Sequence, residues 1–408
     1  MADTIPGESS PYSGKLSASP LIPYSHRRSV ISFCTANFLW WVSLYLYVPV
    51  LPVYVQLAGA QLNMVGVVLA AYAIPQVLLR IPVGLWSDRM GRRKPLVVTG
   101  IIVVSLGALG LGLAETPWLL FLARMTTGIG AAMWVVFPVY LTAYYPAKDS
   151  GRAIALINFV RGGALIVATA GGGFIAEAFG LRQTFLGAAV LGLLALFAFL
   201  FAKEQPVAQA RDASWRSFLS VATRPMLVTV SIMGIMVTFS NFAGVFGFVP
   251  IYAAQIGASS SELGLITMVN LGFSTLGSLA VVWLWGKLGY RVTIILGAVF
   301  IGTSLMAVPF ILTVPALMAV QVSYGLGTGI LGTTLMALSI RGLSREQQAT
   351  AMGVFQAVYA VGMLMGPLVS GYLGAGLGLS AIFFVAAFLT LLVAIMAFLP
   401  VLSRRATV

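Results

Sequence analysis

Residues 62–94 read LNMVGVVLAAYAIPQVLLRIPVGLWSDRMGRRK, an apolar run of about 25 residues that ends in a short, highly charged loop. A helix of about 20 residues spans the roughly 30 Å of hydrocarbon in a bilayer, because each residue adds about 1.5 Å. The apolar part, residues 62–86, is therefore expected to cross a membrane as a helix. The charged part then marks the point where the chain returns to water.

The composition of the whole chain agrees with this stretch. Sixty per cent of its 408 residues are hydrophobic and only 8% are charged, and the mean hydropathy is +1.00. So little polar surface cannot cover a soluble globule of this size. Backbone groups in lipid need internal partners, and the apolar runs are too long for the strands of a membrane barrel. We therefore predict an all-α membrane protein.

Cysteine and histidine are almost absent from the sequence. Cys34 is the only cysteine, so an internal disulfide is impossible, and its apolar surroundings favour a packing role. His26 is the only histidine, which removes histidine-built metal sites and histidine-activated nucleophiles. We expect no enzymatic activity, no metal and no cofactor. The sequence also lacks a Gly-x-x-x-x-Gly-Lys-Ser/Thr loop, which disfavours nucleotide-driven pumping.

Apolar runs of similar length recur along the chain. We predict twelve transmembrane helices, near residues 30–54, 62–86, 95–114, 118–144, 153–178, 182–202, 225–254, 262–285, 291–312, 315–340, 349–373 and 379–402. Most of the 23 Lys and Arg residues fall in the tails and in alternate loops, on one side of these spans. By the positive-inside rule this side, with both termini, is cytoplasmic. The basic residues thus report topology and do not indicate a nucleic-acid partner.

The sequence repeats itself after 198 residues. Leu51-Pro52-Val53-Tyr54 superposes on Val249-Pro250-Ile251-Tyr252, and Gly59, Gly66 and Gly91 superpose on Gly257, Gly264 and Gly289. In the fourth span, Gly128-Ile129-Gly130 returns as Gly327-Thr328-Gly329 after 199 residues. Two parallel six-helix halves, with a substrate cavity at their interface, are typical of transporters that work by rocking.

We therefore predict twelve transmembrane helices in two pseudo-symmetric six-helix bundles. The expected segments are a disordered cytoplasmic tail rich in Ser and Pro, an N-terminal bundle, a cytoplasmic linker, a C-terminal bundle and a short cytoplasmic tail, at residues 1–28, 29–202, 203–224, 225–402 and 403–408.

The charged loop Gly84-Leu85-Trp86-Ser87-Asp88-Arg89-Met90-Gly91-Arg92-Arg93-Lys94 resembles the signature loop of the major facilitator superfamily. In that family the cluster acts as a cytoplasmic latch that favours closure of one side. The resemblance implies latch roles for Gly84, Asp88, Arg89, Gly91, Arg92 and Arg93. Physically, Gly84 lets a neighbouring helix come close, Gly91 permits a tight turn, and Asp88 can accept hydrogen bonds from basic side chains or a helix N-terminus. The alternative is that the charges only fix topology.

The second half carries Gly286 where the acidic residue of the loop would be, so any latch is one-sided. Two shorter motifs also resemble the family: the first given below resembles a motif of its twelve-helix drug:proton antiporter branch, and the second resembles a motif found in its proton-coupled members. Pro49-Val50-Leu51-Pro52 ends the first span, and in the fourth span Arg124 precedes a group of small residues, Gly128, Gly130, Ala131 and Ala132. A charge in hydrocarbon is costly unless it is paired or hydrated, so a functional role is expected for Arg124, with snorkelling as the alternative. The branch's Gly-Pro run in the fifth helix is absent.

Arginines are the only ionisable residues well inside the predicted spans, at Arg80, Arg124 and Arg161. A cationic substrate is disfavoured because no buried carboxylate would attract it. Arg161 lies near the middle of the fifth span, with Asn158 one turn before it. Its guanidinium suits a carboxylate or phosphate, so we hypothesise that it binds an anionic group; a bridge to carbonyls or amides is the alternative. For Arg80 we expect a structural contact or snorkelling.

In the family that the chain resembles, helices 1, 4, 7 and 10 line the cavity. Polar and aromatic residues there and in neighbouring helices are candidate substrate contacts, although each can equally join helices. The candidate set is Asn37, Trp41, Tyr45, Arg124, Trp134, Asn158, Arg161, Asn241, Gln321, Tyr324, Gln356 and Tyr359, with Gln76 and Asn270 as further amides nearby.

Together these features predict a secondary transporter of the inner membrane that moves a small amphipathic or anionic organic solute by alternating access. We expect export and a monomer embedded in the lipid bilayer. Coupling to protons is implied by the resemblance alone, and uniport or anion-linked symport stay open because the membrane core lacks acids. The alternatives of the same fold are a lysolipid or lipid transporter and an organic-anion importer.

Overall fold

The structure is a computed structural model that describes residues 26–146, 149–205, 220–343 and 345–402. Within these ranges only the backbone is described for Asp88, Arg345, Glu346 and Ala349. The predicted disordered tail lies outside the described residues except at its last three positions. Most of the predicted linker and the tail at 403–408 lie outside them as well.

Helices make up nearly all of the described chain, and no strand occurs in it. The main helices are α1 (Arg27–Tyr45), α2 (Leu51–Leu57), α3 (Leu62–Ala71), α4 (Ala73–Met90), α5 (Lys94–Leu113), α6 (Pro117–Ala132), α7 (Val136–Thr142), α8 (Ser150–Phe179), α9 (Leu181–Leu200), α11 (Pro225–Ala243), α12 (Val249–Gln255), α13 (Ser260–Ala307), α14 (Val314–Ser339), α15 (Arg345–Leu377) and α16 (Leu379–Met396). Two short segments, η2 (Met133–Val135) and the π-helical η4 (Gly244–Phe248), complete the transmembrane part. This confirms the predicted all-α membrane fold.

The predicted spans agree with the helices to within a few residues. Ten described stretches are long and apolar enough to cross a membrane. One of them, Ser260–Phe310, consists of two successive helices, because Gly289 interrupts it with φ 74° and ψ 163°. The first predicted span is filled by α1 and α2, with a break at residues 46–50. The count of twelve itself stays a prediction.

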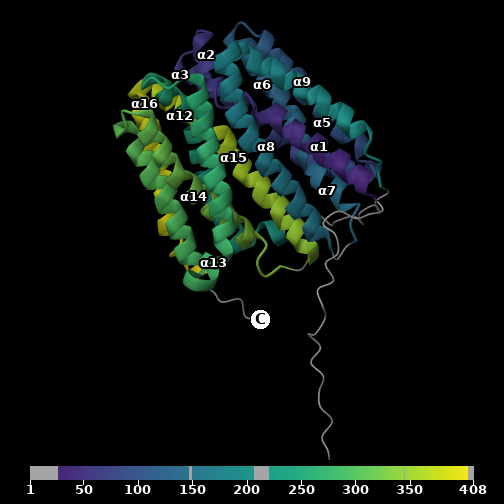
Figure 1. Cartoon of the computed structure of the whole chain (residues 1–408). Coiled ribbons are helices and arrows are strands. Elements are labelled where there is room, and N and C mark those ends of the chain that lie inside the picture. Colours follow the sequence, from purple (N-terminus) through teal and green to yellow (C-terminus); the bar gives the residue numbers. More distant parts are fainter. Residues whose placement is uncertain (1–25, 147–148, 206–219, 344, 403–408) are drawn as a thin grey trace, which may run out of the picture.

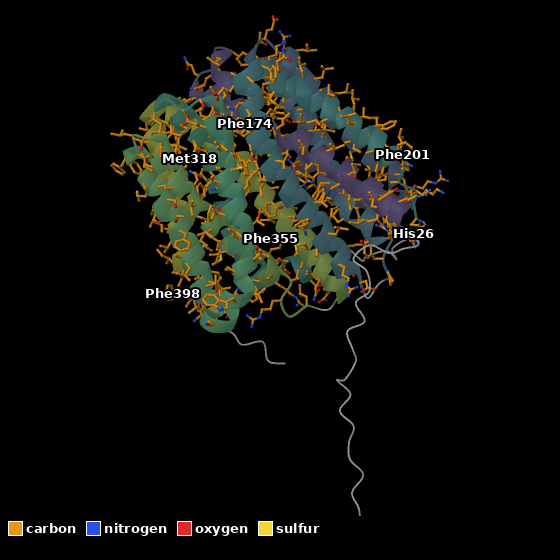
Figure 2. The ribbon with its side chains drawn as sticks, in the orientation of Figure 1. His26, Phe174, Phe201, Met318, Phe355 and Phe398 are labelled. Carbon is orange, nitrogen blue, oxygen red and sulfur yellow. The ribbon has the colours of Figure 1, made fainter. Side chains whose placement is uncertain are left out.

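Large apolar side chains cover the outside of the bundle. Phe201 and Phe398 extend from its periphery, with 63% and 70% of their surface exposed (Figure 2). Such a surface would promote aggregation in water, but it suits contact with lipid tails. The helices of the two sequence halves lie side by side, purple to teal on one side and green to yellow on the other, and α15 lies between them (Figure 1).

Two side-chain hydrogen bonds of the first half are repeated at equivalent positions in the second half. The Tyr54 hydroxyl donates to Ala114 O at 3.5 Å, and Tyr252 repeats this bond to Ile311 O at 2.7 Å. The Ser43 hydroxyl donates to Ala188 O, and Ser240 repeats that bond to Ala386 O. Equivalent residues pack in equivalent ways, which supports the two-bundle architecture. The bundle limits at 29–202 and 225–402 remain our proposal.

The repeat is not in constant register. Ser240 lies 197 residues after Ser43, whereas Tyr252 lies 198 residues after Tyr54. Between them the second half contains η4, a π-helical turn, which accommodates one extra residue.

The predicted glycine alignment in the fourth span is wrong by one glycine. A Cβ on Gly130 would lie 2.8 Å from Gly100 O, and one on Gly327 would lie 2.7 Å from Gly297 O, so Gly327 is the equivalent of Gly130. Gly128 faces Tyr72 O as Gly325 faces Asn270 O. The sequence cannot select this register, because Gly325, Gly327 and Gly329 offer two equally spaced pairs. The expected role of these small residues, close helix approach, is confirmed.

The two halves touch most closely at two glycine pairs on the side away from the chain termini. A Cβ on Gly173 of α8 would lie 2.9 Å from the Cα of Gly264 in α13, and one on Gly66 of α3 would lie 2.9 Å from the Cα of Gly371 in α15. The repeat relates these pairs, since each partner lies 198 residues from its equivalent. Nearby, the Ser261 backbone N–H donates to the Glu177 carboxylate at 2.8 Å across the same interface.

This contact predicts how substitutions in α8 behave. In Gly173→Ala the new methyl would lie 2.6 Å from Ser260 O, so we expect a loss of about 1–3 kcal/mol from overpacking and a weaker closure of this side. Gly171→Ala, two residues earlier, is the matched control, because no atom lies within 4 Å of its Cβ position. Thermal unfolding of the two purified variants tests this. Equal unfolding temperatures would contradict it.

Candidate functional site

A cavity of about 210 Å³ lies between the two halves. The first half contributes Trp41, Tyr45, Tyr72, Gln76, Arg80, Ala131, Trp134, Arg161 and Leu165. The second half contributes Thr238, Asn241, Phe242, Val245, Phe246, Asn270, Leu271, Ser274, Thr328, Tyr359 and Met363. These lining residues include two arginines and no acidic residue.

Arg161 is held against the aromatic wall of the cavity. Its Cζ lies 4.6 Å from the centre of the Trp41 ring and 6.0 Å from that of Trp134. The two indoles meet edge to face, with centroids 4.9 Å apart. Cation–π contact fixes the guanidinium without neutralising it. Its Nε is buried and has no hydrogen-bond partner.

Arg80 also lines the cavity, one helical turn after Gln76 in α4. Its Nη2 donates to Gln76 Oε1, and Gln76 in turn donates to Tyr72 O at 3.2 Å. The expected structural contact is therefore made. However, Nε and Nη1 of Arg80 are buried without a partner, so this arginine still has donors to offer. It was absent from the candidate substrate-binding set.

Arg124 lies behind the cavity wall and not in it. Its side chain is only 6% exposed. Its Nη1 donates to the Tyr47 hydroxyl at 3.2 Å, and its Cζ lies 4.2 Å from the centre of the Tyr72 ring. Gly128, one turn later in α6, lets the Tyr72 backbone approach closely enough for this stacking. Arg124 is thus buried in the bundle and does not snorkel.

The second half presents neutral polar groups to the cavity. Asn241, Asn270 and Thr328 line it, and Asn270 Nδ2 donates to Gln321 Oε1 at 3.1 Å. Phe246 faces Tyr45 across the boundary between the halves, with ring centroids 6.0 Å apart. The site therefore has one cationic, aromatic wall and one uncharged wall of amides and aromatic rings.

Six of the twelve candidate substrate-binding residues line the cavity, namely Trp41, Tyr45, Trp134, Arg161, Asn241 and Tyr359. The other six lie elsewhere. Asn37, Gln321 and Tyr324 are fully buried between helices, and Arg124 lies behind Tyr72. Asn158 is exposed one turn before Arg161, and Gln356 lies one turn before Tyr359. Residues three apart on a helix differ by a net rotation of about 60° and by about 4.5 Å along the axis, and neither Asn158 nor Gln356 is among the residues that line the cavity.

The residues that the candidate set missed are Arg80 and aromatic or hydroxyl side chains such as Tyr72, Phe246, Ser274 and Thr328. Tyr72 lies at the junction of α3 and α4, where the repeat matches it to Asn270, another lining residue. The internal repeat could therefore have identified this pair. No sequence signal distinguishes the other aromatic residues from ordinary packing residues.

The latch loop is described only in part. Gly91 ends α4 with φ 62°, which confirms the tight turn expected of it. Gly84 makes no close helix contact, since no atom lies within 4 Å of its Cβ position, and this corrects the expectation for it. Arg89 and Arg92 are exposed, whereas Arg93 is buried and its backbone N–H donates to the Glu204 carboxylate. Glu204 lies four residues after the end of α9, at the start of the predicted linker, so it anchors the loop to the end of α9. The latch role remains a prediction.

Comparisons with known proteins agree on one family. The family model described as Major Facilitator Superfamily matches residues 33–255 and 231–407. The multi-drug resistance efflux pump PmrA of Streptococcus pneumoniae is 27% identical over 371 residues, which cover 85% of this chain and 90% of that protein. A bacterial homologue of the human lysosomal transporter Spinster, solved in an inward-facing and unoccupied conformation, has a TM-score of 0.78 at 16% identity and covers 93% of this chain and 98% of its own.

The human organic anion transporter MFSD10 has a TM-score of 0.66 at 16% identity, over 92% of this chain and all of its own. At such identities these two solved structures establish the fold alone.

Tyr324 is expected to stabilise the second half and not to bind substrate, and this can be tested by substitution. Its hydroxyl donates to Ser240 O at 2.8 Å in the core of the second half. Tyr324→Phe removes the hydroxyl that donates to the Ser240 carbonyl, so we expect the free energy of unfolding to fall by about 1 kcal/mol. Tyr359→Phe is the matched control, because Tyr359 lines the cavity and is half-buried. Thermal unfolding should separate the two variants, and a Tyr324→Phe protein as stable as the wild type would argue against the structural role.

Proposed function

The chain belongs to the major facilitator superfamily, and on this premise we propose that it exports a small amphipathic organic anion across the inner membrane by alternating access. The main support for this proposal is the positive charge of the central cavity. Arg80 and Arg161 line it, and its lining contains no carboxylate.

The electrostatics of the cavity favour an anionic ligand. Each arginine has at least one buried nitrogen without a hydrogen-bond partner, and neither faces an acidic residue in the cavity lining. Cationic groups in a low-dielectric site are costly unless they are paired. A carboxylate or phosphate supplies the missing charge and accepts bonds from the planar guanidinium, whereas a cationic ligand would be repelled.

The two walls of the cavity differ in charge and polarity, and this difference suits an amphipathic ligand. The anionic group would lie at the first half, against Arg161 and the indoles that hold it. The aromatic rings on both sides offer apolar contact to the middle of the molecule. An uncharged polar end would meet Asn241 and Asn270 of the second half, whose amides are good hydrogen-bond partners. A cavity of about 210 Å³ limits such a ligand to a small molecule.

Alternating access is supported by where the halves touch. The glycine pairs that join them lie away from the chain termini, and Gly173 is about 18 Å along α8 from Arg161. On that side the halves are therefore joined by contacts that the repeat makes symmetrical. Rocking of the halves about the site would break these contacts and expose the cavity to the other side.

Export is supported by a relative and by the charge of the ligand. PmrA is named an efflux pump. The cytoplasm is electrically negative, so the membrane potential drives anions outward with about 2.3 kcal/mol per charge per 100 mV. The cavity lining offers no carboxylate or histidine to carry a proton. We therefore propose that the membrane potential supplies the driving force, with proton coupling as the competing outcome of the test below.

Binding of an anion should depend on the guanidinium of Arg161. We expect Arg161→Gln to weaken binding of an aromatic carboxylate about 10- to 100-fold, since a hydrogen bond to a charged group contributes about 1.5–3 kcal/mol. Arg161→Lys should recover only part of the loss, because an ammonium lacks the planar fork. Thermal-shift titration of the purified variants with the carboxylate and with its neutral amide measures both effects.

Arg182→Gln is the control for this titration, because it removes an exposed arginine outside the cavity. The neutral amide should bind wild type and Arg161→Gln alike. A carboxylate that binds both equally well would show that Arg161 does not hold the anionic group. Stabilisation by lysolipids in place of small carboxylates would favour the lipid-transporter alternative.

Transport itself should follow the membrane potential. In proteoliposomes loaded with potassium, valinomycin sets the potential without a pH gradient. We expect 100 mV to drive up to about a 50-fold gradient of a monoanionic substrate, toward the positive side. A transport rate that ignores the potential and follows an imposed pH gradient would instead establish proton coupling.

A further inference from the structure

A monoanionic substrate would neutralise only one of the two arginines that line the central cavity. The proposed site places an anionic group against Arg161, whereas Arg80 lies in the same lining on α4. Nη2 of Arg80 donates to Oε1 of Gln76, an uncharged partner, and its Nε and Nη1 are buried without a hydrogen-bond partner. A buried cation is costly unless an anion accompanies it. Arg80 would therefore still lack a counter-charge when a monoanion is bound.

The two guanidinium groups are held by different side chains. Arg161 of α8 stacks on Trp41 and is hydrogen-bonded to Tyr45. Arg80 is held instead by Gln76, one turn earlier on its own helix. None of these partners carries a charge, and each arginine keeps a buried Nε that has no hydrogen-bond partner. Two separately held cations suit two separate anionic groups better than a single one.

The internal repeat indicates that helix packing does not require a cation at either position. Arg80 corresponds to Ser278 and Arg161 corresponds to Tyr359, each 198 residues later. The Ser278 hydroxyl donates to Gly329 O of α14 at 3.3 Å, so this position joins helices in the second half without a charge. Tyr359 lines the cavity, as Arg161 does, but is uncharged. The two positive charges therefore belong to the chemistry of the first-half wall and not to the shared scaffold.

Resting on the proposed function, we propose that the substrate carries two separate carboxylates, one bound by Arg161 and the other by Arg80. Two anionic groups balance the two cations of the lining, and a planar guanidinium is a strong donor to a carboxylate. The apolar body between the carboxylates would contact the aromatic rings that line the first half of the cavity, those of Trp41, Tyr45 and Tyr72. The substrate class is thus a small dicarboxylate with an apolar body.

The test compares ligands that differ only in their second anionic group. The full-length purified protein is titrated with isophthalate and terephthalate, and with their half-amides 3-carbamoylbenzoate and 4-carbamoylbenzoate, at neutral pH, where the carboxylates are ionised. We expect at least one dicarboxylate to bind about 10- to 100-fold more tightly than its half-amide, because it gains a hydrogen bond between charged groups. In Arg80→Gln the two affinities should become equal.

A second variant keeps the test decisive if Arg80→Gln does not fold. Gln76→Glu retains Arg80 and the shape of its partner but adds a carboxylate that would neutralise it, so the preference for the dicarboxylate should again disappear. Arg182→Gln, which removes an exposed arginine outside the cavity, should keep the preference.

Two results would overturn the inference. One is equal affinity of the wild type for each dicarboxylate and its half-amide, and the other is a preference that persists in Arg80→Gln. Either result would leave the proposed function standing if the half-amides still bind and Arg161→Gln weakens their binding. Half-amides that bind equally well to the wild type and to Arg161→Gln would instead count against the proposed function itself.

Discussion

Close backbone contact at glycine residues holds the helices of this protein together. Lipid provides no hydrophobic force between helices, so they associate by close packing, and close packing requires small residues at the crossings. Gly130 meets Gly100 within the first half, and Gly327 meets Gly297 in the second. Gly173 and Gly264 then bring the halves together. The same close contacts recur in both halves, and the pair that joins them has its own equivalent in Gly66 and Gly371.

The same close packing creates the environment of the arginines. Gly128 admits the Tyr72 backbone, and the Tyr72 ring then covers Arg124. Arg161 is likewise held by the rings of Trp41 and Trp134. Aromatic faces stabilise a cation without cancelling its charge. The protein therefore keeps its positive charge available at the centre of the membrane, where an anion is the natural partner.

The two halves share a scaffold but differ in chemistry. Ser43 and Ser240, or Tyr54 and Tyr252, make equivalent bonds in equivalent places. All three arginines of the membrane interior nevertheless lie in the first half, and the second half presents amides at the cavity. Symmetry of packing suits the proposed rocking of the halves, whereas asymmetry of charge would give the proposed ligand a defined orientation.

The all-α membrane class, the span limits to within a few residues, the internal repeat and the absence of acids from the membrane core could all be predicted from the amino-acid sequence. These properties follow from length, hydropathy and residue type, which are local. Which side chains meet became clear from the folded structure. It placed Arg161 and Tyr359 in the cavity but Asn158 and Gln356 one turn away from it, and it turned Arg80 inward and Arg124 behind Tyr72. The cavity lies where ten or more segments of the chain meet. Which residues line it depends on how each helix is rotated about its axis and how far it is shifted along that axis. These two quantities are set by packing between helices and cannot be derived from the sequence of one segment.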